Sequence, residues 1–265
     1  MKTFIAVTSA IAGILALTAG ATYYMYKKSE SEAEELEQSD EKILFCKCDT
    51  ELVGINVNDK HRNKNTIIIG PAGSGKSYSF ILSNLLNEKI SAICVDPYGS
   101  IRSDYEKMGK NPNIKSTVEE VCKEPGVFFI SGKDATGYKV LQTYNKVVLH
   151  NSVNPDSARH VVFFIDDYAK LNYIPVIERM LSNDHVHFEI AVQTLDQLKT
   201  SNQFWQTIVD KCDNVLMFGN CAESDIEVIS AIHNVCIPEL KQDECAFISK
   251  NSMLRANRLT PSNFV

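Results

Sequence analysis

The sequence lacks several features that would each point to a particular class of protein. It has no C-x-x-C pair, and its one close cysteine pair is Cys46-Lys47-Cys48, so a structural zinc site is not expected. Its net charge of −6 excludes a histone-like nucleic-acid binder. It has no internal repeat, and its 44% apolar and 23% charged residues exclude collagen-like and disordered chains. The eight cysteines are scattered, and we expect reduced, mostly buried thiols.

The first 28 residues carry three lysines and no acid. Residues 4–26 carry no charge, and as a helix they would span about 34 Å, enough to cross a bilayer. Three tyrosines and then two lysines close this stretch, which favours a cytoplasmic body after it under the positive-inside rule. We therefore expect residues 1–28 to be a single-pass anchor in the cell membrane. The alternative is a signal peptide cleaved near Ala19-Gly20-Ala21.

Residues 29–42 hold seven acids and one lysine, a net charge of −6. Such a segment is typical of a solvated tether or an exposed helix. We expect it to separate the anchor from a body formed by residues 43–265.

In that body, short apolar runs alternate with longer amphipathic stretches, which indicates an α/β fold with a largely parallel sheet covered on both faces. The expected strands are 43–46, 52–57, 66–69, 90–95, 127–130, 161–165, 188–192, 215–218 and 246–248. The expected helices are 76–87, 101–108, 171–181, 203–210 and 224–233.

The most specific motif is G-x-x-x-x-G-K-[ST] at residues 70–77, between an expected strand and an expected helix. Its glycines let backbone N–H groups face phosphate oxygens, and the helix N-terminus adds partial positive charge. We expect a phosphate loop that binds ATP, with Lys76 on the β- and γ-phosphates and Ser77 on Mg²⁺. Its residues are Gly70, Pro71, Ala72, Gly73, Ser74, Gly75, Lys76 and Ser77.

Acids at the end of a second strand complete such a site. Asp166 and Asp167 follow the apolar run 161–165, and Asp166 is the expected second Mg²⁺ ligand. Asp167 stands where a glutamate usually polarises the attacking water, although its side chain is one methylene shorter. Gln193 ends another apolar run and is placed to sense the γ-phosphate or orient water. Asp96 ends a similar strand and is the alternative to Asp166.

Several segments occur in the order of a known family. They are GPAGSGKS (70–77), ICVDPYGSI (93–101), FFIDDYAKLNYIPVIERML (163–181) and IAVQTLDQL (190–198), with weaker matches at 212–230 and 240–249. From about residue 66 to 250 the chain resembles the type IV secretion coupling proteins. These are the TraG/TraD class of conjugative ATPases in the HerA/FtsK group of P-loop motors.

The resemblance implies a RecA-like P-loop NTPase that assembles as a ring, usually a hexamer. It also implies that the motor passes DNA or relaxase-bound DNA to a secretion channel, and that a membrane anchor precedes it. Lys76, Asp167 and Gln193 would then be the catalytic residues.

Three departures from the family pattern stand out. The second acid is Asp167 rather than Glu, and Asp184 falls about where the family often has an arginine, with Arg179 nearby. About 30 residues separate Ile130 from Val161, too few for the all-α domain usually inserted there. The resemblance with these departures therefore indicates a reduced coupling protein or a paralogue of one.

We expect a membrane-anchored ATPase that moves DNA or relaxase-DNA in conjugative transfer. Two alternatives remain open. One is a nucleotide-binding, hydrolysis-weak scaffold subunit of a secretion or mobile-element apparatus. The other is a FtsK/HerA-like DNA translocase unrelated to secretion.

Overall fold

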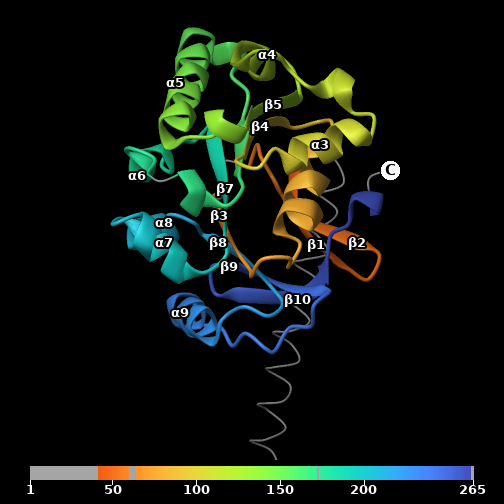
Figure 1. Cartoon of the computed structure of the whole chain (residues 1–265), viewed down its shortest axis with the longest axis vertical. Helices are drawn as coiled ribbons and strands as arrows, with labels where there is room; N and C mark the ends of the chain where they lie inside the picture. Colours follow the sequence, from red (N-terminus) through yellow and green to blue (C-terminus); the bar gives the residue numbers. More distant parts are fainter. Residues whose placement is uncertain (1–40, 60–63, 172, 264–265) are drawn as a thin grey trace, which may run out of the picture. The chain divides into compact units, whose positions relative to one another are not determined.

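The computed structural model describes residues 41–59, 64–171 and 173–263 (Figure 1). The expected anchor at 1–28 lies outside the described residues, as does the tether except for its last two positions. Among the residues that the structure describes, none of the helices is both long and apolar enough to span a bilayer.

The described chain is built on one ten-stranded sheet in the order β2-β1-β10-β9-β8-β3-β7-β6-β4-β5. Its six strands from β8 to β5 run parallel, and the remaining pairs are antiparallel. The strands are β1 (Lys42–Cys48), β2 (Glu51–Asn56), β3 (Thr66–Ile69), β4 (Ser91–Asp96), β5 (Gly126–Ser131), β6 (Val161–Ile165), β7 (Val186–Val192), β8 (Asn214–Phe218), β9 (Glu244–Ser249) and β10 (Ser252–Arg258). The expected α/β fold with a largely parallel sheet is therefore confirmed.

Helices cover both faces of the parallel strands (Figure 1). On one face lie η1 (Lys76–Leu82), its continuation α2 (Ser83–Leu85), and α3 (Ser100–Lys107). The other face carries α4 (Val118–Lys123), α5 (Gly137–Val153), α6 (Ile177–Met180), α7 (Leu195–Ser201), α8 (Trp205–Asp210) and α9 (Glu223–His233). Short 3₁₀ turns complete the connections: η2 (Asn111–Asn113), η3 (Gly132–Asp134), η4 (Pro155–Ser157), η5 (Tyr168–Leu171) and η6 (Pro261–Asn263).

The central strand β3 shows why the parallel strands are apolar at most positions. Ile67 and Ile69 belong to the core on the face covered by α4 to α9, while Ile68 belongs to the core on the face covered by η1, α2 and α3. Successive side chains of a strand point to opposite faces, so a strand covered on both faces needs a continuous apolar run.

One expected helix is wrong. Residues 171–181 do not form a single helix, because η5 ends at Leu171 and α6 begins only at Ile177. Pro175 cannot donate a backbone hydrogen bond, and Val176 has φ 56°, which a continuous α-helix does not permit.

Three helices and one strand were not anticipated from the sequence: α4, α5, α7 and β10. The segment between β5 and β6 holds α5 with two short turns, η3 and η4. The structure describes every residue of this connection, and it contains no separate all-α domain. This agrees with the expectation that the inserted all-α domain of the family is missing here.

Two histidines, the half-buried His160 and the buried His187, lie together where β6 and β7 begin. His160 Nδ1 and His187 Nε2 lie 2.9 Å apart, and their rings stack at 5.1 Å. Burial is the main cause that lowers the pKa of His160 to about 4 and that of His187 to about 3. His185 and Lys64 lower both further, while Glu41 and Asp184 oppose the shift at His160.

This pair should make the fold sensitive to acid. In the unfolded chain each histidine binds a proton near pH 6.5, whereas in the folded chain neither histidine does so until about pH 4. Stability is therefore lost as pH falls through that window. Between pH 7.5 and 5 we expect a loss of about 2 kcal/mol per histidine in the free energy of unfolding. Urea titrations should show that His187→Gln roughly halves this loss. An unchanged pH dependence in the variant would contradict the prediction.

Candidate nucleotide site

The loop after β3 is fixed at its start by a backbone hydrogen bond and turns tightly at Gly75. Gly70 N–H donates to the Val192 carbonyl at 3.3 Å, which fixes the loop's first residue beside the end of β7. Gly75 has φ 101°, and a Cβ at this position would lie 2.8 Å from Ser79 Oγ. Only glycine avoids both the strain of this positive φ and the close contact between a Cβ and Ser79 Oγ. The loop therefore turns tightly enough for Lys76 to open the following helix.

The Lys76 side chain folds over its own loop. Its ammonium donates to the carbonyl oxygen of Gly70 and, at 3.0 Å, to that of Pro71. Burial lowers the pKa of Lys76, and the carboxylates of Asp166 and Asp167 oppose that shift. The Lys76 ammonium therefore lies against the first two residues of the loop and near Asp166 and Asp167, the two acids expected from the sequence.

Ser77 and Asp166 meet across 89 residues of sequence. Ser77 Oγ donates to Asp166 Oδ1 at 2.8 Å. Burial raises the pKa of Asp166 to about 6; the Ser77 hydrogen bond and Lys76 oppose the rise, and Asp96 and Asp167 add to it. A hydroxyl and a carboxylate are hard oxygen ligands, and together they fit Mg²⁺. Among the described residues no cluster of three or more His, Cys, Asp or Glu side chains suits a metal ion.

Asp167 lies beside this pair, but its carboxylate contacts Tyr98 rather than Ser77. Its Oδ2 accepts from the Tyr98 hydroxyl at 2.7 Å, and its Oδ1 is buried without a hydrogen-bond partner in the described part of the chain. That hydrogen bond is the main cause that raises the pKa of Tyr98 to about 12. Asp167 also has φ 43°, which is uncommon for a residue with a side chain.

Gln193 and Asp96 lie at the ends of the two strands that flank β6, since Gln193 follows β7 and Asp96 ends β4. β7 lies between β3 and β6, so Gln193, which follows Val192, lies across from Gly70 and between the loop and the acids. Asp96 ends β4 and is fully buried, and its Oδ2 accepts from the backbone N–H of Arg102 at 3.0 Å. Asp96 thus holds the start of α3, whereas Asp166 contacts Ser77.

The structure does not bring every residue singled out from the sequence to this edge. Asp184 precedes β7 and therefore lies at the amino end of the parallel strands, opposite the phosphate loop. Arg179 is exposed on α6.

Two residues near the loop were missed by sequence reasoning. Arg258, the last residue of β10, donates from Nη1 to the Ser74 carbonyl at 2.8 Å, so a cation from the antiparallel part of the sheet holds the loop. The sequence feature that could have indicated β10 is the two-residue hairpin turn at Lys250-Asn251. This turn joins β9 to β10, because Ser249 of β9 pairs with Ser252 of β10. No local sequence pattern indicated a role for Tyr98, because its hydrogen-bond partner Asp167 lies 69 residues away.

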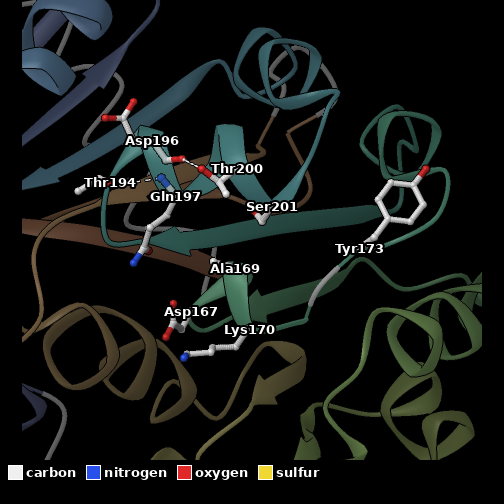
Figure 2. Close-up of a pocket in the computed structure, with 9 residues that line it drawn as sticks. All are labelled: Asp167, Ala169, Lys170, Tyr173, Thr194, Asp196, Gln197, Thr200 and Ser201. Carbon is white, nitrogen blue, oxygen red and sulfur yellow. Dashed lines mark hydrogen bonds between the residues drawn. The ribbon is translucent and has the colours of Figure 1, made fainter.

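A cavity of about 670 Å³ adjoins Asp167 (Figure 2). Figure 2 shows Asp167 and Lys170 on one side of it and Gln197 and Thr200 of α7 on the other. Gln197 Oε1 is buried with no hydrogen-bond partner among the described residues. The cavity leaves room for a polar group beside the Asp167 carboxylate. Its lining is Asp167, Ala169, Lys170, Tyr173, Thr194, Asp196, Gln197, Thr200 and Ser201.

The fold and the loop together resemble P-loop ATPases. The profile of the family described as Type IV secretory system Conjugative DNA transfer matches residues 26–108, which confirms the resemblance to conjugative ATPases noted in the sequence. No curated protein sequence matches this chain significantly.

Solved structures share the fold at low sequence identity. The genome packaging NTPase B204 from Sulfolobus turreted icosahedral virus 2, in complex with ATP-gammaS, is 16% identical (TM-score 0.53; 74% of this chain and 98% of that one). VirB4 of Thermoanaerobacter pseudethanolicus is 12% identical (TM-score 0.52; 83% and 96%). The pCW3 conjugation coupling protein TcpA, a monomer form with ATPgS, is 14% identical (TM-score 0.51; 85% and 70%).

Proposed function

We propose that this chain is a reduced, membrane-anchored ATPase of the type IV secretion coupling class, which uses ATP to move DNA or relaxase-bound DNA. The observation that carries the proposal is the Ser77–Asp166 hydrogen bond beside Lys76. It joins a phosphate loop to the acid of a second strand, as nucleotide hydrolysis requires. The family match and the nucleotide-bound structures with this fold support the proposal.

In the proposed reaction, water attacks the γ-phosphorus, the bond to the β-phosphate oxygen breaks, and Asp167 accepts a proton from the water. Lys76 would stabilise charge on the β- and γ-phosphates, and Gln193 would orient the water. Ser77 and Asp166 would hold Mg²⁺, which when bound neutralises charge on the phosphate oxygens.

The partners follow from the family resemblance. They would be DNA or a relaxase, secretion-channel proteins, and further copies of the chain in a ring. The charge-free stretch at residues 4–26 supports a single-pass location in the cell membrane, with the ATPase domain in the cytoplasm.

The test is steady-state ATP turnover by the full-length protein, with and without DNA, beside Lys76→Ala. We expect turnover that depends on Mg²⁺ and Lys76 and that rises when DNA is added. Turnover that is independent of Lys76 would refute the proposed site. Lys76-dependent turnover that DNA leaves unchanged would argue against DNA as the substrate.

One observation favours a second candidate, a nucleotide-binding scaffold that hydrolyses ATP weakly. Asp167 has a shorter side chain than glutamate, and one of its two carboxylate oxygens is already bound to Tyr98. Such a subunit would bind ATP with Lys76 and Ser77 but turn it over slowly, with or without DNA.

Asp167→Glu separates the two candidates. If Asp167 is the base and its reach limits the rate, the longer side chain should raise turnover by about ten-fold, because misplacement of a catalytic group by about 1 Å costs up to about 100-fold. Single-turnover hydrolysis of labelled ATP measures this directly. Unchanged turnover in Asp167→Glu, together with lost Mg²⁺-dependent binding in Asp166→Asn, would favour the scaffold.

A further inference from the structure

The residue that contacts Asp167 comes from a rigid turn at the end of β4. Asp96-Pro97-Tyr98-Gly99 closes with a hydrogen bond from Gly99 N–H to the Asp96 carbonyl at 3.2 Å, and Gly99 has φ 73°. Asp96 is also tied to α3 through the Arg102 N–H at 3.0 Å. The turn is therefore closed on itself and tied to α3 at Asp96, and Tyr98 projects from it with 59% of its surface exposed.

Asp167 is held by its backbone and by one carboxylate oxygen. Its carbonyl accepts from Lys170 N–H at 2.8 Å, which closes the turn after β6, and its Oδ2 accepts from the Tyr98 hydroxyl at 2.7 Å. The terminal torsion of an aspartate is broad and roughly two-fold, so a carboxylate without such a bond samples many orientations. The Tyr98 bond removes that freedom and leaves Oδ1 as the buried acceptor with no partner among the described residues.

We propose that Tyr98 is a positioning residue for hydrolysis: it fixes one oxygen of Asp167 so that the other faces the attacking water. This inference rests on the proposed ATPase function. A glutamate can reach water through an extra methylene, whereas an aspartate has to be placed accurately by its neighbours. In this chain the phenol of Tyr98 supplies that placement from the next strand of the sheet, since β4 pairs with β6.

The test is steady-state kinetics of the full-length protein carrying Tyr98→Phe, which removes the hydroxyl and keeps the ring. We expect kcat to fall about ten-fold while KM for ATP stays within two-fold, because the carboxylate is misoriented and the phosphate loop is untouched. The matched control is Tyr138→Phe, an exposed tyrosine on α5, which should leave both constants unchanged.

A second background shows whether Tyr98 acts through Asp167. In Asp167→Glu, the longer side chain should need no clamp, so adding Tyr98→Phe should change kcat less than two-fold. An equal loss in both backgrounds would overturn the inference, as would a normal or raised kcat in Tyr98→Phe alone, or an effect on KM only. Loss of turnover in Lys76→Ala with no effect of Tyr98→Phe would overturn this inference and leave the proposed function intact. Full turnover in Lys76→Ala, or none in the wild type, would overturn both.

Discussion

Lys76→Ala should weaken ATP binding by about 10- to 150-fold and remove turnover. A charge-assisted contact between an ammonium and phosphate is worth about 1.5–3 kcal/mol, which corresponds to that range of affinity. Alanine cannot replace the contact, because no other lysine projects from the loop at 70–77. Titration of fluorescently labelled ATP into wild type and variant measures the difference.

The control for this prediction is Lys107→Ala, which removes a lysine whose side chain is 70% exposed on α3. It should bind ATP as the wild type does. The loop itself should survive the Lys76→Ala exchange, because its glycines and the Gly70–Val192 backbone bond are unchanged. Equal affinities in Lys76→Ala and wild type would show that this loop does not bind the nucleotide phosphates.

Asp166→Asn should have opposite effects on catalysis and on stability. Hydrolysis should fall by at least about 100-fold, because a neutral amide is a poor ligand for Mg²⁺ and a misplaced phosphate loses reactivity. Without Mg²⁺ or nucleotide, the same exchange should stabilise the fold at pH 7.5, because it removes a buried negative charge. Single-turnover hydrolysis and urea unfolding in EDTA measure the two effects.

The stabilisation should depend on pH with a definite sign. The pKa of Asp166 is about 6 in the folded chain and 3.8 when unperturbed, so the cost of its charge is present above pH 6 and absent below about 4. The difference of about 2 pKa units corresponds to about 3 kcal/mol at pH 7.5. The exposed Asp156→Asn, on the turn before β6, should change neither hydrolysis nor stability. Destabilisation by Asp166→Asn at pH 7.5 would contradict the prediction.

Local sequence patterns predicted most of the parallel sheet correctly. Each of its strands carries apolar side chains at nearly every position because both faces are covered, so the runs at 66–69 and 161–165 could be read directly. Helix α5 was missed, since only some of its turns face the core and Leu149 and Val153 are exposed, which weakens the periodic pattern. The helix expected at 171–181 is interrupted at Pro175, because proline lacks the N–H that a continuous helix needs, even where the pattern of apolar residues favours one.

The sequence by itself predicted a phosphate loop at 70–77, because eight consecutive residues contain the glycines, the lysine and the serine that such a loop needs. It also indicated which strand would carry Asp166 and Asp167. Only the tertiary structure decided what these residues contact: Ser77 with Asp166, Tyr98 with Asp167, and Arg258 with the loop. Those contacts depend on the order β3-β7-β6-β4 and on the antiparallel return of β10. Strand order is set by packing between segments far apart in the chain, which no local pattern of residues encodes.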